Sequence, residues 1–323
     1  MGKRWTAVFL CLCLLTGLLS GCTATQNIPR VAVIVKSVNS DFFQKMRHGV
    51  NSAATEFQVA VTFDAPDSEE DYAAQNGMIA QAVENGVDAI VLSAIDYERS
   101  APAVENAVRH GIKVITVDSG VHSESVKQFI GTDNRLAGRA AADAAVERPD
   151  MEKPVYIGVV SYMNATENGK RREEGFREAI REVPNATVAA SVTVESTVAA
   201  ATEGALRLLE DNPEINVLVG FNEWMTLGVG EAIRQKGCAK QVRGVGFDSN
   251  ISSVSMLETG EMDVLIVQNP FAMGYLGVKN AAELLNGKNL EKEVYTATVT
   301  VNVGNLYDAD VQKILFRFDS ETH

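Results

Sequence analysis

The sequence predicts an α/β protein built from two doubly wound parallel sheets. Short apolar runs rich in Val and Ile alternate with longer segments of helical periodicity along most of the chain. This alternation is typical of parallel sheets that carry helices on both faces. There are too many such runs for one small sheet, and they show no eightfold closure. A length of 323 residues also suits two domains of ordinary size.

The first half of the chain supplies four strands. Residues 31–35 are an uninterrupted run of branched and small apolar side chains, as expected of a buried parallel strand. Residues 41–57 have apolar side chains at helical spacing and predict a helix. The same patterns predict further strands at 59–63, 89–93 and 114–117 and helices at 69–85 and 101–110.

The alternation repeats in the second half of the chain and therefore predicts a second sheet. The predicted helices are 136–146, 167–182, 197–210, 223–235 and 271–285. The predicted strands are 155–160, 187–194, 217–220, 242–247, 264–267 and, at the end, 295–303.

The N-terminal residues have the layout of a secretory signal. Lys3 and Arg4 give a positive start, and residues 5–19 are almost entirely apolar. This run is too short to span a bilayer core of ~30 Å comfortably, so it predicts a cleaved signal and not a membrane helix. It ends in Leu19-Ser20-Gly21-Cys22, which resembles a bacterial lipobox. The resemblance implies cleavage before Cys22 and a diacylglycerol on its sulfur.

Lipidation of Cys22 would hold the protein on the extracytoplasmic face of the cell membrane, because two or more acyl chains give stable attachment. Two alternatives stay open. One is an ordinary cleaved signal with a chance cysteine, and the other is myristoylation at Gly2, although the apolar run behind Gly2 favours the secretory signal. We expect a lipoprotein signal peptide at residues 1–21 and a polar tether at residues 22–29.

Charge and cysteine content exclude several classes of protein. The chain has 29 basic and 42 acidic side chains, and so negative a surface argues against a nucleic-acid partner. Of the four cysteines, Cys238 alone would remain as a free thiol in the mature chain, so no intrachain disulfide is expected. The four histidines lack metal-ligand spacing. We therefore expect no metal and no cofactor.

Polar and aromatic side chains follow the carboxyl ends of the predicted strands, which is where doubly wound sheets bind ligands. These side chains include carboxylates, amides, a guanidinium and aromatic rings. Sugar hydroxyls both donate and accept hydrogen bonds, which suits the polar groups. The C–H faces of a sugar stack on aromatic rings. The strand ends therefore predict a sugar site.

Seven motifs occur in order at these positions: NSDFF, ITVDS, IGTDN followed by AG, RREEGF, GFNEWMTLG, VGFD and IVQNP. From about residue 30 to about residue 303 the chain thereby resembles the type I periplasmic binding proteins, specifically the ribose-binding group that feeds ABC importers. The resemblance implies two lobes joined by three hinge crossings, near residues 131–133, 268–270 and 292–295. One sugar-binding lobe would comprise residues 30–132 and 269–294, and the other residues 133–268 and 295–323.

The resemblance also implies a ligand set. It includes two stacking aromatics, a carboxylate after the fourth strand, and the arginine of the R-x-x-G-F motif. It also includes the asparagine before a helix, the aspartate of the G-F-D motif and a glutamine at a crossing. The expected ligand-binding residues are Lys36, Phe42, Phe43, Asp118, Arg172, Asn222, Asp248 and Gln268.

Several of these residues also fit structural roles. Phe42 and Phe43 could belong to the core, and Asn222 could cap the helix that begins at the next residue. Lys36 stands where ribose binders have a serine, and it could instead neutralise Asp118 or Asp96.

Other departures from the ribose pattern are Ser40 and Asp41 in place of asparagine and proline, Ser119 in place of arginine, and no aromatic near residues 195–197. The departures argue against ribose itself. A lysine at position 36 also resembles receptors for the furanose-like autoinducer, whose other ligand residues do not match clearly.

These features predict a monomeric, lipid-anchored receptor that binds a sugar or sugar-like solute by hinge closure and delivers it to an ABC permease. The alternative is a receptor of the same fold that signals to a membrane sensor kinase. An enzyme is not expected, because the chain lacks G-x-x-x-x-G-K-[ST], G-x-G-x-x-G and G-x-S-x-G. A repressor is excluded because no helix-turn-helix precedes residue 30.

Overall fold

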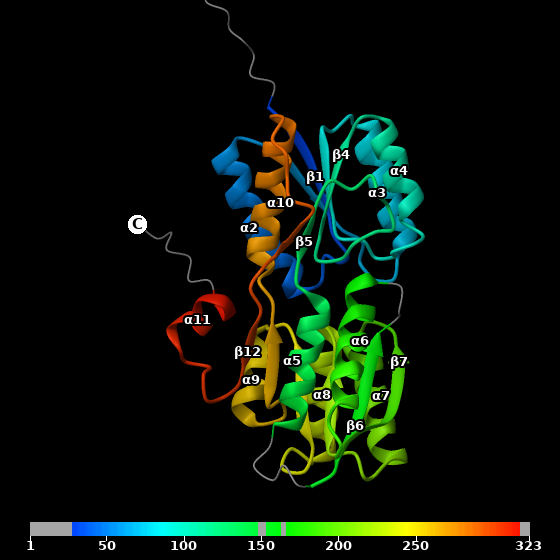
Figure 1. Ribbon diagram of the computed structural model, residues 1–323, viewed down its shortest axis with the longest axis vertical. Coiled ribbons are helices and arrows are strands. Elements are labelled where there is room, and N and C mark those ends of the chain that lie inside the picture. The colour runs from blue at the N-terminus through cyan, green and yellow to red at the C-terminus, as the bar shows by residue number, and fades with distance from the viewer. Residues whose placement is uncertain (1–27, 148–152, 163–165, 317–323) are drawn as a thin grey trace, which may run out of the picture.

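The computed structural model describes residues 28–147, 153–162 and 166–316, and it confirms the predicted fold class. Figure 1 shows two α/β lobes, one above the other along the long axis, and each contains a six-stranded sheet. The predicted signal segment and Cys22 lie outside the described residues. Within the described ranges, no helix combines the length and apolar character needed to cross a membrane.

The N-terminal lobe contains a wholly parallel sheet. Its strands are β1 (Arg30–Ile34), β2 (Ala60–Asp64), β3 (Ala89–Leu92), β4 (Lys113–Val117), β5 (Phe129–Gly131) and β11 (Glu293–Tyr295). Its helices are α2 (Asp41–Phe57), α3 (Tyr72–Glu84), α4 (Ala101–Arg109) and α10 (Pro270–Leu285). The spatial order of the strands is β11-β5-β4-β3-β1-β2.

Helices cover both faces of this sheet because successive residues of each strand point to opposite sides. Val31 and Val33 of β1 belong to the core that α2 and α10 complete. Ala32 and Ile34 belong to the second core, which α3 and α4 complete. Both faces of β1 are therefore buried, which explains its uninterrupted apolar sequence.

The C-terminal lobe repeats the arrangement. Its strands are β6 (Val155–Tyr162), β7 (Ala186–Val194), β8 (Val217–Gly220), β9 (Arg243–Phe247), β10 (Val264–Val267) and β12 (Val299–Val301). Its helices are α5 (Asn134–Val146), α6 (Glu167–Arg181), α7 (Val198–Asp211), α8 (Glu223–Lys236), α9 (Ile251–Thr259) and α11 (Ala309–Leu315). The strand order β12-β10-β9-β8-β6-β7 matches that of the first lobe, so β4 and β9 hold equivalent places. The difference is that β12 runs antiparallel to β10.

One closely packed helix pair in each lobe depends on glycine. A Cβ atom on Gly49 of α2 would lie 2.0 Å from the carbonyl oxygen of Phe271 in α10. A Cβ atom on Gly138 of α5 would lie 2.0 Å from the carbonyl oxygen of Arg172 in α6. Only a residue without a side chain permits this approach. The contact at Gly138 fixes the position of α6 and therefore of the Arg172 side chain.

The chain passes between the lobes three times: after β5, after β10 and after β11. The first crossing follows Gly131 and the second follows Val267. The third was predicted at residues 292–295, but residues 293–295 form β11 and pair with β5. That crossing therefore follows Tyr295, and the first lobe extends one residue beyond its predicted boundary.

The prediction of one late strand at residues 295–303 is also wrong. The alternating segment is divided between β11 and β12, because the chain changes from one sheet to the other between them. The sequence analysis also missed β5, α9 and α11. These elements have 3, 9 and 7 residues and are too short for a periodic pattern to stand out.

Candidate functional site

The residues that follow the strands of both sheets enclose a cavity between the lobes. The free space enclosed there is about 20 Å³, room for about one water molecule. Its lining contains all eight residues that the sequence singled out, together with five that it did not. The lining residues are Lys36, Ser40, Phe42, Phe43, Glu69, Asp118, Tyr162, Asn168, Arg172, Asn222, Glu223, Asp248 and Gln268.

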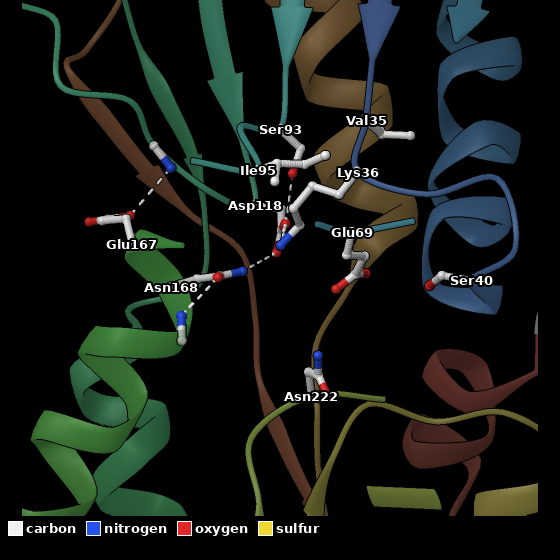
Figure 2. A network of polar contacts seen from close by, with 12 residues as sticks. Val35, Lys36, Ser40, Glu69, Ser93, Ile95, Asp118, Glu167, Asn168 and Asn222 are labelled. Atoms are coloured by element: carbon white, nitrogen blue, oxygen red, sulfur yellow. Dashed lines mark hydrogen bonds and ion pairs between the residues drawn. The ribbon is translucent and has the colours of Figure 1, made fainter. Parts of the chain in front are cut away.

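Lys36 and Asp118 form a buried ion pair on the N-terminal side of the cavity (Figure 2). Lys36 Nζ lies 3.0 Å from Asp118 Oδ2, and the Ser93 hydroxyl donates to the same oxygen at 2.8 Å. Burial is the largest single influence on the pKa of Lys36 and lowers it, but Asp118, Glu69 and Tyr162 together outweigh burial, so that the pKa is raised. Burial acts to raise the pKa of Asp118, but Lys36 and Arg172 together lower it. Both groups are therefore charged, and Asp118 rather than Asp96 is the partner of Lys36.

Arg172 projects from α6 and is 1% exposed. Its Nε donates to Asn134 Oδ1 at 2.8 Å, its Nη1 to the Phe221 carbonyl at 2.9 Å, and its Nη2 to Gln268 Oε1 at 2.7 Å. The guanidinium lies over the Phe247 ring, 4.7 Å from the ring centroid. These partners are all uncharged and occupy three of the five N–H groups. The side chain is thus held rigidly while its charge remains available to the cavity.

Asp248 follows β9 and accepts a hydrogen bond from Gln268 Nε2 at 2.7 Å. Burial raises the pKa of Asp248 to about 6, although Arg172 and Gln268 act to lower it. Asp118 holds the equivalent place after β4. The backbone φ is 60° at Asp118 and 67° at Asp248, a left-handed region that is uncommon for residues other than glycine but that Asp and Asn adopt more readily than most. The two equivalent aspartates thus share an unusual backbone conformation beside the cavity.

Phe42 and Phe43 belong both to the core and to the cavity. Their rings pack edge to face at 5.1 Å, and Phe43 is fully buried. Asn222 is the N-cap of α8, as the alternative interpretation suggested, because its Oδ1 accepts from the Met225 amide at 2.9 Å. Its Nδ2 donates to the Ser196 hydroxyl at 2.9 Å. Phe42, Phe43 and Asn222 therefore each have a structural role and also line the cavity.

Three cavity residues that the sequence analysis missed join the two lobes. Asn168 of α6 donates to Asp118 Oδ1 at 2.9 Å (Figure 2). Glu223 accepts from the Ser40 hydroxyl at 2.6 Å and from the Phe42 amide at 3.4 Å. Asn168 could have been predicted from its spacing, since it precedes Arg172 by one helical turn in α6. Glu223 could have been predicted from its motif, since it follows Asn222 directly.

The other two lining residues outside the expected ligand set are Tyr162, which could also be expected to line the mouth of the cleft or to belong to the core, and Glu69. The Tyr162 hydroxyl donates to Asn168 Oδ1 at 3.2 Å. Glu69 lies between β2 and α3 on a loop that carries no recognised motif, so no sequence signal identified it.

Comparisons with known proteins agree with this geometry. A family model described as a periplasmic binding protein domain matches residues 31–289. A D-ribose/D-allose-binding protein of Pseudomonas aeruginosa is 27% identical over 282 residues, which are 83% of this chain and 86% of the relative. A carbohydrate transporter solute-binding protein of Agrobacterium radiobacter in complex with D-arabinose has a TM-score of 0.87 at 26% identity, covering 90% of this chain and 100% of that one.

A second solved structure is similar to the same extent. It is an ABC transporter solute-binding protein of Agrobacterium vitis with bound D-fucose, with a TM-score of 0.85 at 30% identity over 89% of this chain and 100% of the other. Fold, cavity and relatives together define a two-lobed solute-binding protein. The chain belongs to the periplasmic binding protein family, in its type I sugar-binding branch. It is an extracytoplasmic binding protein and, as predicted, not an enzyme.

Proposed function

We propose that this protein is a lipid-anchored receptor that binds a sugar or sugar-like solute between its lobes and delivers it to an ABC importer. The observation that carries the proposal is the cavity, whose lining includes all eight residues expected from the family motifs. The similar proteins described above bind D-ribose or D-allose, D-arabinose and D-fucose, which supports a monosaccharide as the ligand.

The lining suits a sugar chemically. Arg172 donates to ring or hydroxyl oxygens, and Asp118 and Asp248 accept from hydroxyl groups. Phe42 and Phe43 offer apolar surface to the C–H face of a sugar ring. Hydrogen bonds to charged groups contribute about 1.5–3 kcal/mol each. A few such bonds are sufficient to select one monosaccharide over another.

Hinge closure would couple binding to delivery. Asp118 belongs to one lobe and Asp248 to the other, so a ligand touching both stabilises the arrangement in which the lobes meet. The bonds from Asn168 to Asp118 and from Ser40 to Glu223 add direct contacts across the cavity. The importer would recognise the surface that the two joined lobes form.

Anchoring through Cys22 would keep a monomeric receptor beside its permease, and the lipobox-like sequence supports it. The alternative of a receptor for a membrane sensor kinase gains no support from the relatives named above, which are transport proteins by name. Permease and ATPase genes beside the gene for this chain would favour transport, whereas a sensor kinase gene would favour signalling.

A thermal-shift screen of the purified protein against a panel of monosaccharides tests the proposal. A true ligand at 100 times its Kd should add about 2.7 kcal/mol of stability. Calorimetry on Arg172→Ala and Asp248→Ala should then show loss of binding by folded protein. If no monosaccharide shifts the transition, or if both variants bind within threefold of wild type, the proposed site is wrong.

A further inference from the structure

Glu69 introduces a carboxylate into the cavity wall at a place that no family motif marks. In Figure 2 it lies between Lys36 and Asn222, on the loop that leads into α3. It comes from the N-terminal lobe and faces the residues of the C-terminal lobe. The resemblance to ribose-binding proteins implies an aromatic ring near residues 195–197, where this chain has Glu195, Ser196 and Thr197.

Polar contacts occupy the region where that aromatic ring is missing. The Ser196 hydroxyl donates to Glu69 Oε2 at 3.1 Å, and the Ser196 amide donates to Glu70 Oε1 at 2.8 Å. The Asn222 amide in turn donates to the Ser196 hydroxyl. This side of the cavity therefore offers hydrogen-bond acceptors where a stacking surface was expected.

The charges that line the cavity do not balance. Its cations are Lys36 and Arg172, and its carboxylates are Glu69, Asp118, Glu223 and Asp248. Lys36 is paired with Asp118. Arg172 and Asp248 are joined through the side chain of Gln268.

Glu223 and Glu69 differ in how well they are satisfied. Glu223 accepts from Ser40, from the Phe42 amide and from Asn250 Nδ2 at 2.8 Å. Within the part of the chain that the structure describes, Glu69 accepts from the Ser196 hydroxyl and has no ion pair. Asp248 likewise accepts one hydrogen bond and has no ion pair among the described residues, but Gln268 links it to Arg172. No cation is hydrogen-bonded to Glu69 or linked to it in this way within the described ranges, although the Lys36 ammonium acts on it from nearby.

We infer that the ligand carries a protonated amino group, as in an amino sugar, and that Glu69 is the specificity-determining residue that binds this group. The inference rests on the proposed function and adds the class of sugar. An ammonium donates hydrogen bonds and brings the positive charge that the lining lacks. A neutral sugar would leave the partly buried Glu69 carboxylate to share the Lys36 ammonium, which already pairs with Asp118, and incomplete compensation of a buried charge is costly.

The electrostatics of Glu69 agree with this assignment. Burial raises the pKa of Glu69 above its usual value, and the Lys36 ammonium offsets this only in part because Asp118 lies beside the same ammonium. A cation within hydrogen-bond distance would favour the ionised carboxylate.

Calorimetry on matched sugar pairs tests the inference. Each pair consists of a hexose and its analogue with an amino group at carbon 2, 3 or 6, for example D-glucose and D-glucosamine. Wild-type protein should bind one amino sugar about tenfold or more tightly than its hydroxyl parent, since hydrogen bonds to charged groups exceed neutral ones. Glu69→Gln should reduce this preference to less than about threefold, because the neutral amide keeps the shape but not the charge.

Glu70→Gln is the matched control, because Glu70 contacts the same Ser196 loop but does not line the cavity. It should leave the preference within about threefold of wild type. Wild-type protein that binds neutral parents as tightly as their amino analogues would overturn the inference and leave the proposed function intact. Equal loss of preference in both variants would overturn the role of Glu69. Absence of binding by every monosaccharide would instead contradict the proposed function.

Discussion

Replacement of Asp248 by Asn should make the protein more stable and a poorer receptor at the same time. The carboxylate is 7% exposed and is bound by a single amide donor, Gln268. An Asn side chain can accept the same hydrogen bond through its Oδ1. Asn also tolerates the left-handed φ of 67° at this position. The substitution therefore removes the charge with little change of shape.

The magnitude follows from the pKa of Asp248. Burial raises that pKa from 3.8 to about 6 in the folded protein. A raised pKa means that the folded state binds the proton more tightly, so the stabilising effect of protonation is complete below pH 3.8 and is lost as the pH rises through about 6. A difference of about two units corresponds to about 3 kcal/mol. Asp248→Asn should therefore add up to about 3 kcal/mol to the free energy of unfolding at pH 7.5.

Urea unfolding followed by the fluorescence of Trp224, which lies in α8 of the same lobe, measures this effect. The gain should be present at pH 7.5 and should be much smaller at pH 4. Sugar affinity should fall about tenfold or more, because a charged acceptor is lost. An equal or lower stability of the variant at pH 7.5 would refute the electrostatic reasoning.

Asp118→Asn is the contrasting variant. Asp118 holds the equivalent place in the other lobe and also has a positive φ, but its pKa is lowered because Lys36 and Arg172 outweigh burial. Its contribution to stability is therefore present at neutral pH and is lost as the pH falls through the folded-state pKa. Removal of its charge leaves Lys36 buried without a partner, which should destabilise the protein by about 3–5 kcal/mol. The two aspartates should thus give effects of opposite sign.

Three further predictions concern the helix contact at Gly138, the role of Lys36 and the lipidation of Cys22. Gly138→Ala should destabilise the protein by about 1–3 kcal/mol and weaken sugar binding, because it displaces the helix that carries Arg172. Gly77→Ala is its control, since the added methyl meets open space within α3, and it should stabilise by up to about 1 kcal/mol. Lys36→Ser should lower affinity for the native ligand and raise affinity for aldopentoses, and an unchanged ranking of sugars would reduce Lys36 to charge balance with Asp118. Cys22→Ala should release the protein from the membrane fraction or leave its precursor uncut, and normal processing with membrane retention would contradict lipidation.

Many of the helices and strands could be predicted from local sequence patterns. The helix predicted at residues 41–57 has those bounds in the structure, and the strand at residues 217–220 does as well. These elements could be predicted because a helix buried on one face has apolar residues at helical spacing, and a strand buried on both faces is a continuous apolar run. The short helix α9 shows no such pattern, because its sequence ISSVSMLET mixes serines with apolar residues.

The residues of the candidate site also fall into two groups, those that sequence motifs predicted and those that they did not. Phe42, Asp118, Arg172 and Asp248 could be singled out because each occupies a fixed place in a motif at the end of a strand or the start of a helix. Glu69 could not, because its relevance depends on a loop of the other lobe that is 127 residues away in the sequence. The raised pKa of Asp248 and the lowered pKa of Asp118 could not be predicted from the sequence either, since both depend on burial and on which charges lie nearby in space.

The sequence by itself therefore determined the class of fold, the repetition of the α/β pattern and the side chains available at the strand ends. Those properties depend on local periodicity and on the rule that parallel strands bring their carboxyl ends to one edge. The tertiary structure alone decided that Lys36 pairs with Asp118, that Glu223 bonds to Ser40 across the cavity, and that Glu69 accepts a hydrogen bond from Ser196 of the other lobe. Partners far apart in the chain are chosen by how the two lobes pack, and no short-range pattern encodes that choice.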